Sequence, residues 1–153
     1  MKIGLSGGEG LRAKLEEVRQ KVGKGELLRL GFLENATYPD GTPVAYIAAI
    51  NEYGNPANNQ PPRPFFRRMI AEKSPGWGAS MAKVLKAADC NLDVAFGRMG
   101  EGIRGQLQAS IRQLDAPALA AATIAAKGFE KPLVDTGHML NSVDYDIQKA
   151  GGA

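Results

Sequence analysis

The feature that most constrains the fold is a long stripe of apolar residues in the middle of the chain. Six apolar side chains recur at intervals of three or four residues: Leu92, Phe96, Met99, Ile103, Leu107 and Ile111. This spacing places them on one face of an amphipathic helix. Residues 79–88 show the same spacing, and one unbroken helix over 79–113 would be ~50 Å long. Because that is long for a small domain, we expect two segments or a kink near residues 89–93.

Glycines interrupt the second of these segments at four positions: Gly97, Gly100, Gly102 and Gly105. Each weakens a helix interior by about 1 kcal/mol relative to alanine. Two explanations remain open. Another element could pack closely against this helix, or the helix could bend at an assembly interface.

The length of 153 residues fits a single domain, because domains cluster near ~100–150 residues. We therefore expect one domain over residues 1–153, with frayed residues at 149–153. The single Cys90 cannot form an internal disulfide, which suits a reducing compartment. Together with the only histidine, His138, it cannot complete a four-ligand Cys/His zinc site. No apolar run approaches the ~18 residues of a membrane span, and the N-terminus does not look like a signal peptide.

Two segments alternate like strands. Residues 26–34 place Leu28, Leu30 and Phe32 on one face, and residues 143–147 place Val143, Tyr145 and Ile147 on one face. The expected turn between the first strand and the next helix is Tyr38-Pro39-Asp40-Gly41. The pattern predicts an α+β fold, in which a small antiparallel or mixed β-sheet packs with several helices, including a long or kinked central helix.

Further helices are predicted from their start and stop signals. A Ser6-x-x-Glu9 capping box opens a helix that ends near Gly23 and carries an apolar stripe of Leu11, Leu15, Val18 and Val22. Thr42 is expected to cap a helix over 45–53 that stops at Gly54. The remaining expected helices cover residues 64–72, 117–127 and 138–141, with a break at 74–76.

The charges are unevenly placed, although the net charge is only +3. Residues 1–62 are neutral, residues 63–113 carry +5 and residues 114–153 carry −2. The basic and acidic parts can attract one another within a chain or between copies. One alternative function is therefore a stand-alone nucleic-acid-binding module with phosphate contacts from basic residues of this middle segment: Arg67, Arg68, Lys83, Lys86, Arg98 and Arg104.

Catalytic chemistry has little support in the sequence. His138 and Ser142 are four residues apart, a spacing that lets side chains meet on a helix, but no carboxylate is clearly placed to orient the histidine. We interpret His138 as a surface or packing residue and Cys90 as a buried or bystander thiol. No phosphate-binding loop or dinucleotide fingerprint is present in the sequence.

Two longer segments carry a family pattern. The first runs from Val44 to Gly54, followed by a polar loop and Pro62-Arg63-Pro64-Phe65-Phe66, and the second runs from Lys131 to Val143. In this order, separated by helical sequence, they resemble the neck or tail-completion proteins of long-tailed bacteriophages and related minor tail and virion-morphogenesis proteins. The residues that carry the resemblance are Glu52, Tyr53, Gly54, Pro62, Arg63, Pro64, Phe65, Pro132, Leu133, Asp135, Thr136 and Gly137.

The resemblance implies a structural virion protein that forms a ring, commonly a homohexamer, at the head–tail junction or the top of the tail. Such a ring joins the connector to the tail tube, and DNA passes through its lumen without specific binding. The implied partners are other copies of the chain, connector, adaptor or stopper proteins, and tail-tube or tail-terminator proteins. The implied location is the virion, after assembly in the cytoplasm of the bacterial host. No enzymatic activity, cofactor or metal is implied.

The polar loop and the residues after it are the predicted interaction element. The loop over residues 55–63 has no large apolar side chain to bury and contains three prolines, so we expect it to be exposed. Arg63 lies between prolines that stiffen the chain, so its guanidinium can be presented to a partner with little loss of entropy. The alternative is that this motif only fixes the local fold. Asp135 and Thr136 are typical of helix capping. The predicted interaction residues are Asn55, Asn58, Asn59, Gln60, Arg63, Arg67 and Arg68.

Overall fold

The computed structural model describes residues 8–22, 25–114 and 137–149. Within these residues the order of elements is α1 (Gly8–Val22), β1 (Glu26–Phe32), α2 (Val44–Tyr53), the short 3-10 helix η1 (Pro56–Asn58), α3 (Phe65–Ala87), α4 (Leu92–Gln113), α6 (His138–Asn141) and β2 (Val143–Lys149). The two strands form an antiparallel sheet. The predicted α+β class is therefore confirmed. The expected helix over 117–127 lies outside the described residues.

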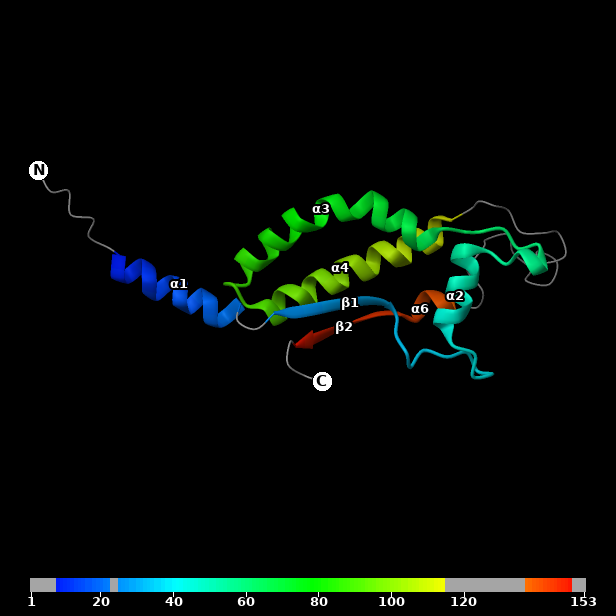
Figure 1. Ribbon diagram of the computed structural model, residues 1–153, viewed down its shortest axis with the longest axis horizontal. Helices are drawn as coiled ribbons and strands as arrows, with labels where there is room; N and C mark the ends of the chain where they lie inside the picture. The colour runs from blue at the N-terminus through cyan, green and yellow to red at the C-terminus, as the bar shows by residue number, and fades with distance from the viewer. Residues whose placement is uncertain (1–7, 23–24, 115–136, 150–153) are drawn as a thin grey trace, which may run out of the picture.

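Helix α4 is the centre of the molecule. The α3 helix packs along one side of it and the β1–β2 sheet along the other, while α2 and α6 lie together at one end (Figure 1). The buried residues of α4 are Ala95, Met99, Gly100, Ile103, Leu107 and Ile111. The predicted apolar stripe thus forms the core from Met99 onward, whereas Leu92 and Phe96 are only half-buried.

The chain reverses direction between α3 and α4. The reversal is made by Asp89 and Cys90, whose φ angles are 49° and 59°, and the Asn91 side chain then accepts a hydrogen bond from Val94 N–H at 3.1 Å. The interruption predicted near residues 89–93 is thus a full turn between two antiparallel helices. No single long helix crosses it.

The predicted break at residues 74–76 is wrong, because α3 continues through Pro75. A proline inside a helix removes one backbone donor and bends the helix. Figure 1 shows α3 as an arch over α4. Packing against α4, which the local sequence does not reveal, compensates for the lost hydrogen bond.

The sheet has the predicted faces. Leu28, Leu30 and Phe32 pair with Ile147, Tyr145 and Val143, and all six lie on the face toward the helices, where Val143 is buried and the others are half-buried. On the opposite face Arg29 Nη2 lies 2.6 Å from Asp146 Oδ2. The second strand extends to Lys149, which pairs with Glu26.

The glycines of α4 have different surroundings. A Cβ atom added at Gly100 would clash with the ring of Tyr145 on β2, so close packing of another element explains this glycine. No described atom lies within 4 Å of a Cβ added at Gly97, Gly102 or Gly105. Close packing within the described part of the chain therefore does not account for these three.

Helix α2 is capped differently from the prediction. Its N-cap is Pro43, and no side chain caps it. Thr42 instead donates its backbone N–H to Asp40 Oδ1 at 2.9 Å, within the predicted Tyr38–Gly41 turn. The predicted Thr42 cap is therefore wrong, whereas the stop at Gly54 is confirmed.

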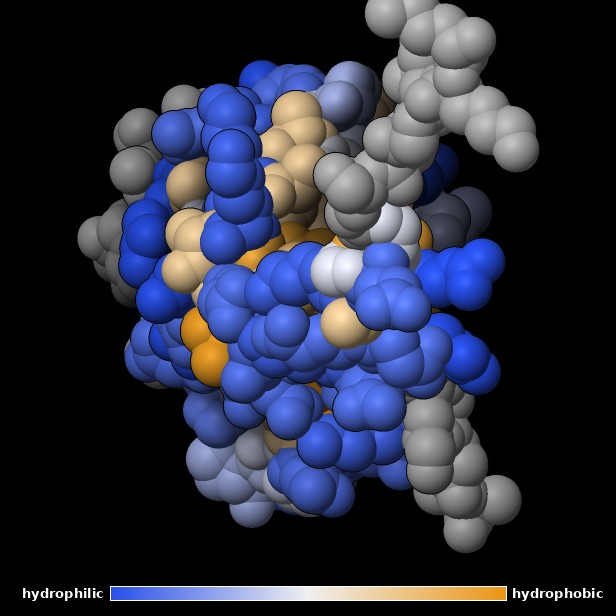
Figure 2. Space-filling view, turned by 90° about the vertical axis from the view of Figure 1, so that its left-hand side faces the viewer, coloured by the Kyte–Doolittle hydropathy of each residue, from blue (hydrophilic) through white to orange (hydrophobic). Residues whose placement is uncertain are grey.

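Helix α1 projects away from the body of the molecule (Figure 1). None of its fifteen residues, all of which the structure describes, is buried. Seen from this end, the surface is mostly hydrophilic, and apolar residues emerge in small separate patches (Figure 2). Among the described helices, none combines the length and the apolar character needed to cross a membrane.

Candidate assembly interface

Glu52 is a buried carboxylate at the end of α2, where it caps the start of α3. Only 5% of the residue is exposed. Its Oε2 accepts the backbone N–H of Phe66 at 2.9 Å, and its Oε1 accepts that of Arg67 at 3.1 Å. The first N–H groups of a helix have no partner inside the helix, and Pro64 at the N-cap has no side-chain oxygen to offer. Glu52 therefore supplies the cap from another helix.

Arg67 closes this unit from the outside. Its Nε donates to Glu52 Oε1 at 2.8 Å and its Nη2 donates to the Glu52 carbonyl at 3.1 Å. Its guanidinium lies 4.8 Å from the centre of the Tyr53 ring, as in a cation–π pair. The Arg67 side chain is 55% exposed, so one face of it remains on the surface. Arg67 thus stabilises the junction between α2 and α3, and part of its side chain remains accessible on the surface.

Two features require a glycine at position 54: its backbone conformation and the close approach of the loop. Its φ angle is 79°, a conformation that glycine adopts readily and other residues do not. A Cβ atom here would lie 2.7 Å from the Gln60 carbonyl oxygen and 2.8 Å from Pro62 N. The Glu-Tyr-Gly element therefore joins two roles: Glu52 caps the next helix and Gly54 lets the loop return to it.

The polar loop is held by its own hydrogen bonds. Asn55 and Gln60 exchange backbone bonds of 2.9 and 3.0 Å around η1. The Gln60 amide donates to Asn51 Oδ1 at 3.1 Å, which ties the loop to α2. Asn58 and Asn59 are exposed at the tip, whereas Asn55 and Gln60 are half-buried. Of the four loop residues predicted to make contacts, only Asn58 and Asn59 are therefore fully exposed.

Arg63 differs from the prediction. It is 6% exposed, and burial lowers the pKa of its guanidinium. Its backbone N–H donates to the Asn51 carbonyl at 2.7 Å. The expectation of a presented guanidinium is not met, and the burial of Arg63 together with its backbone bond to the end of α2 agrees with the alternative that this motif fixes the local fold.

An apolar groove lies beside this unit, and the sequence did not reveal it. Its volume is about 200 Å³, and it is formed by α2, the start of α3 and the end of β1. Its apolar lining consists of Phe32, Ala45, Ala48, Ala49, Phe65 and Phe66, with Glu52, Tyr53 and Arg67 completing it. Ala45, Ala49 and Tyr53 recur every four residues, a signal that could have identified a second row of small and aromatic residues next to the buried row of Val44, Ala48 and Glu52.

Two tyrosines increase the apolar character of this end. Tyr46 and Tyr53 on α2 are 61% and 66% exposed. Tyrosine and arginine are enriched at the centres of protein interfaces. This surface therefore contains residue types that are common at protein interfaces.

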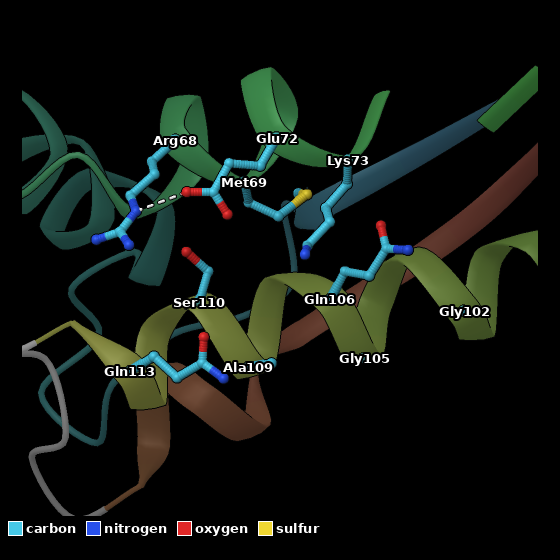
Figure 3. A pocket seen from close by; sticks show the side chains of 10 residues that line it. All are labelled: Arg68, Met69, Glu72, Lys73, Gly102, Gly105, Gln106, Ala109, Ser110 and Gln113. Carbon is cyan, nitrogen blue, oxygen red and sulfur yellow. Dashed lines mark hydrogen bonds and ion pairs between the residues drawn. The ribbon is translucent and has the colours of Figure 1, made fainter. Parts of the chain in front are cut away.

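A second hollow of about 380 Å³ separates α3 from α4. Arg68 and Lys73 reach into it from α3, and Gly102 and Gly105 leave its other wall open (Figure 3). Ser110 Oγ donates to the Phe65 carbonyl at 2.7 Å. Arg68 Nε lies 2.9 Å from Glu72 Oε1, so its charge is partly neutralised.

The predicted phosphate-binding residues do not form one site. Arg67, Arg68 and Arg104 lie 2.7 to 2.9 Å from carboxylates of Glu52, Glu72 and Glu101. Lys83, Lys86 and Arg98 are exposed. Half of the predicted set is thus already partnered by carboxylates within the chain.

The second family motif is described only at its end. Pro132, Leu133, Asp135 and Thr136 lie outside the described residues, and so does the predicted capping role of Asp135 and Thr136. Gly137 has a φ angle of 70° and begins α6. His138 Nε2 donates to the Thr37 carbonyl at 2.8 Å, and the imidazole lies 4.7 Å from the Tyr38 ring. Ser142 Oγ donates to the His138 carbonyl rather than to the ring.

Among the described residues no group of three or more His, Cys, Asp and Glu side chains could hold a metal ion. Comparisons with protein-family models, with curated proteins and with solved structures found no match for this chain.

Proposed function

We propose that this chain is a structural subunit of a bacteriophage neck or tail-completion ring. The observation that carries the proposal is the unit built by the Glu52–Gly54 and Pro62–Phe65 motif residues. The motif residues that give the family resemblance join two helices through Glu52 and place an apolar groove, Tyr53 and Arg67 on one surface. The two motif segments, which are separate in the sequence, thus form one structural unit.

The ring would be built from copies of this chain, six being the commonest number implied by the resemblance. The subunit would join the connector to the tail tube, with its exposed surfaces as contacts. Asn58 and Asn59 at the loop tip and the exposed side of Arg67 are available for contacts with neighbouring proteins. Arg63 is removed from this contact set because it is buried.

Contacts with DNA are expected to be few and independent of sequence. Arg67, Arg68 and Arg104 contact carboxylates of the same chain, which reduces the positive charge available to phosphates. This observation favours the structural subunit over a stand-alone nucleic-acid-binding module.

A deletion of this gene in its phage tests the proposal. The expected result is separate filled heads and complete tails in electron micrographs, with joining restored when the protein is supplied. A shortened loop, in which a two-residue turn replaces residues 56–59, should reduce joining while the purified subunit stays folded. Normal joining after the deletion would contradict the proposal. A gel shift that shows one DNA site bound ~10³-fold better than random DNA would instead support the nucleic-acid-binding module.

A further inference from the structure

Two apolar surfaces lie at opposite ends of the molecule. One is the stripe on α1, formed by Leu11, Leu15, Val18 and Val22. The other is the groove between α2, α3 and β1 described above. Helix α1 extends from one end in Figure 1, and α2 lies at the other. The stripe of one copy is therefore remote from the groove of the same copy.

The α1 stripe lacks a cover within the described part of the chain. Leu11 and Leu15 are 63% and 60% exposed. The helix is tied to the body at its last turn, where Lys21 Nζ lies 2.6 Å from Asp89 Oδ2. A helix of fifteen residues is marginally stable alone in water, and most helices gain their stability by packing an apolar face. A partner for the stripe would supply that packing.

The groove has the size and lining of a receptor for side chains. Its volume of about 200 Å³ is below the roughly 300–1,000 Å³ of typical small-molecule pockets. Ala45 and Ala49 on α2 are small and exposed, which allows another helix to approach closely. Tyr46 and Tyr53 stand on the exposed side of the same helix.

We propose that the α1 stripe of one copy docks into the groove of a second copy. Its apolar residues recur at i, i+4, i+7 and i+11, which is the spacing of anchors that an amphipathic helix places in a groove. Each copy gives its helix at one end and receives another helix at the opposite end. Such a head-to-tail contact forms a ring when the rotation closes. The inference rests on the self-association that the proposed function requires, and it names the contact.

The available area fits a contact that is weak alone and stronger when repeated. Four aliphatic side chains on α1 and a similar apolar set on the groove offer roughly 250–500 Å² on each side, at the area that each apolar side chain buries. A standard stable interface buries ~800 Å² per partner. Each contact is therefore small, and a closed ring strengthens it because every copy is then held by two such contacts at once.

Single substitutions on either surface test the docking. Leu15→Asp places a charge in the stripe, and Ala13→Asp, two residues away on the other side of the helix, is its matched control. Ala49→Glu places a charge in the groove, and Ala71→Glu on the exposed side of α3 is its control. All four positions are exposed, so circular dichroism should show the same fold. We expect light scattering to give the wild-type mass for both controls and the mass of one copy for Leu15→Asp and Ala49→Glu.

Mixing the two disrupted variants gives a sharper test. The Ala49→Glu copy keeps its α1 stripe and the Leu15→Asp copy keeps its groove, so one contact can form between them. An equimolar mixture should therefore contain a two-copy species that neither variant forms alone, and it should not grow larger. Absence of this species even at millimolar concentration, with the wild type assembling, would overturn the inference.

The other outcomes separate this inference from the proposed function. If the wild type assembles and the Leu15→Asp or Ala49→Glu variant keeps its mass, copies associate through another surface, which overturns the docking and leaves the ring intact. If the wild type remains a single copy up to millimolar concentration, the docking is overturned, while the deletion phenotype still decides the proposed function.

Discussion

The Glu52–Arg67 region and helix α1 differ in which side chains are buried and which are exposed. Around Glu52, the polar groups are buried and bonded within the chain, and the loop that follows is closed by its own hydrogen bonds. In α1, the apolar residues are exposed and the charged residues form ion pairs along the helix surface. The first region therefore sustains the fold of one subunit, whereas the second offers a surface that one subunit does not use.

The largest effect should come from Glu52→Ala. It removes the acceptors for two backbone N–H groups of α3 and one partner of Arg67, so we expect a loss of about 3–4 kcal/mol in the free energy of unfolding. Glu17→Ala on α1 removes a carboxylate that also contacts two lysines, Lys14 and Lys21, but exposed ion pairs contribute little to stability, so we expect a much smaller loss. Urea unfolding of both variants measures the contrast, and equal losses would refute the difference between the two regions.

Gly54→Ala should have the next largest effect. It combines an unfavourable positive φ with contact of the new Cβ against the loop backbone, so we expect a loss of about 2–3 kcal/mol. Gly41→Ala is the matched control, because its φ is 84° but the space for a Cβ is open. Its cost should be limited to about 1 kcal/mol of backbone strain. The difference between their unfolding midpoints in urea isolates the contact with the loop.

Two glycines of α4 should respond with opposite signs. Gly100→Ala forces the Tyr145 ring to move and should lose about 1–2 kcal/mol, while Gly105→Ala adds helix propensity in open space and should gain about 0.5–1 kcal/mol. If Gly105 lies in an assembly contact, the same change should weaken association while it raises the unfolding midpoint. A loss of stability in Gly105→Ala would show that a neighbour of this glycine has been overlooked.

The smallest effect concerns pH. Arg29 lowers the pKa of Asp146 below its ordinary value through their hydrogen bond. The pair therefore contributes stability above the unfolded-state pKa of ~3.9, and this contribution is lost as the pH falls through the lower folded-state pKa. Asp146→Asn should thus lower the melting temperature slightly at pH 7 and leave it unchanged near pH 2. A difference that grows as the pH falls would contradict this sign.

The sequence predicted the elements whose periodicity matches their burial. Alternation identified both faces of the sheet, and the stripe from Met99 to Ile111 identified the face of α4 that forms the core. Local rules failed at Pro75 because packing between α3 and α4 outweighs the cost of a proline. They also did not predict the burial of Arg63, whose backbone N–H bonds to the Asn51 carbonyl at the end of α2.

The candidate site was only partly predictable. The motif indicated residues 52–67, but the cap at Glu52 joins two helices and is invisible to rules that examine one helix at a time. The groove was not predicted, because alanines such as Ala45 and Ala49 are common in helices and do not by themselves indicate a binding surface. Its walls come from three elements that become neighbours only in the folded chain.

The most direct test of the central claim is the mass of the full-length protein in solution, measured alone and with connector and tail-tube proteins of its phage. One copy has a mass of 16.3 kDa. We expect a discrete closed species of several copies, most simply six, that forms alone or on the connector or tail tube. A protein that stays a single copy and binds neither neighbour would contradict the claim that it is a ring subunit.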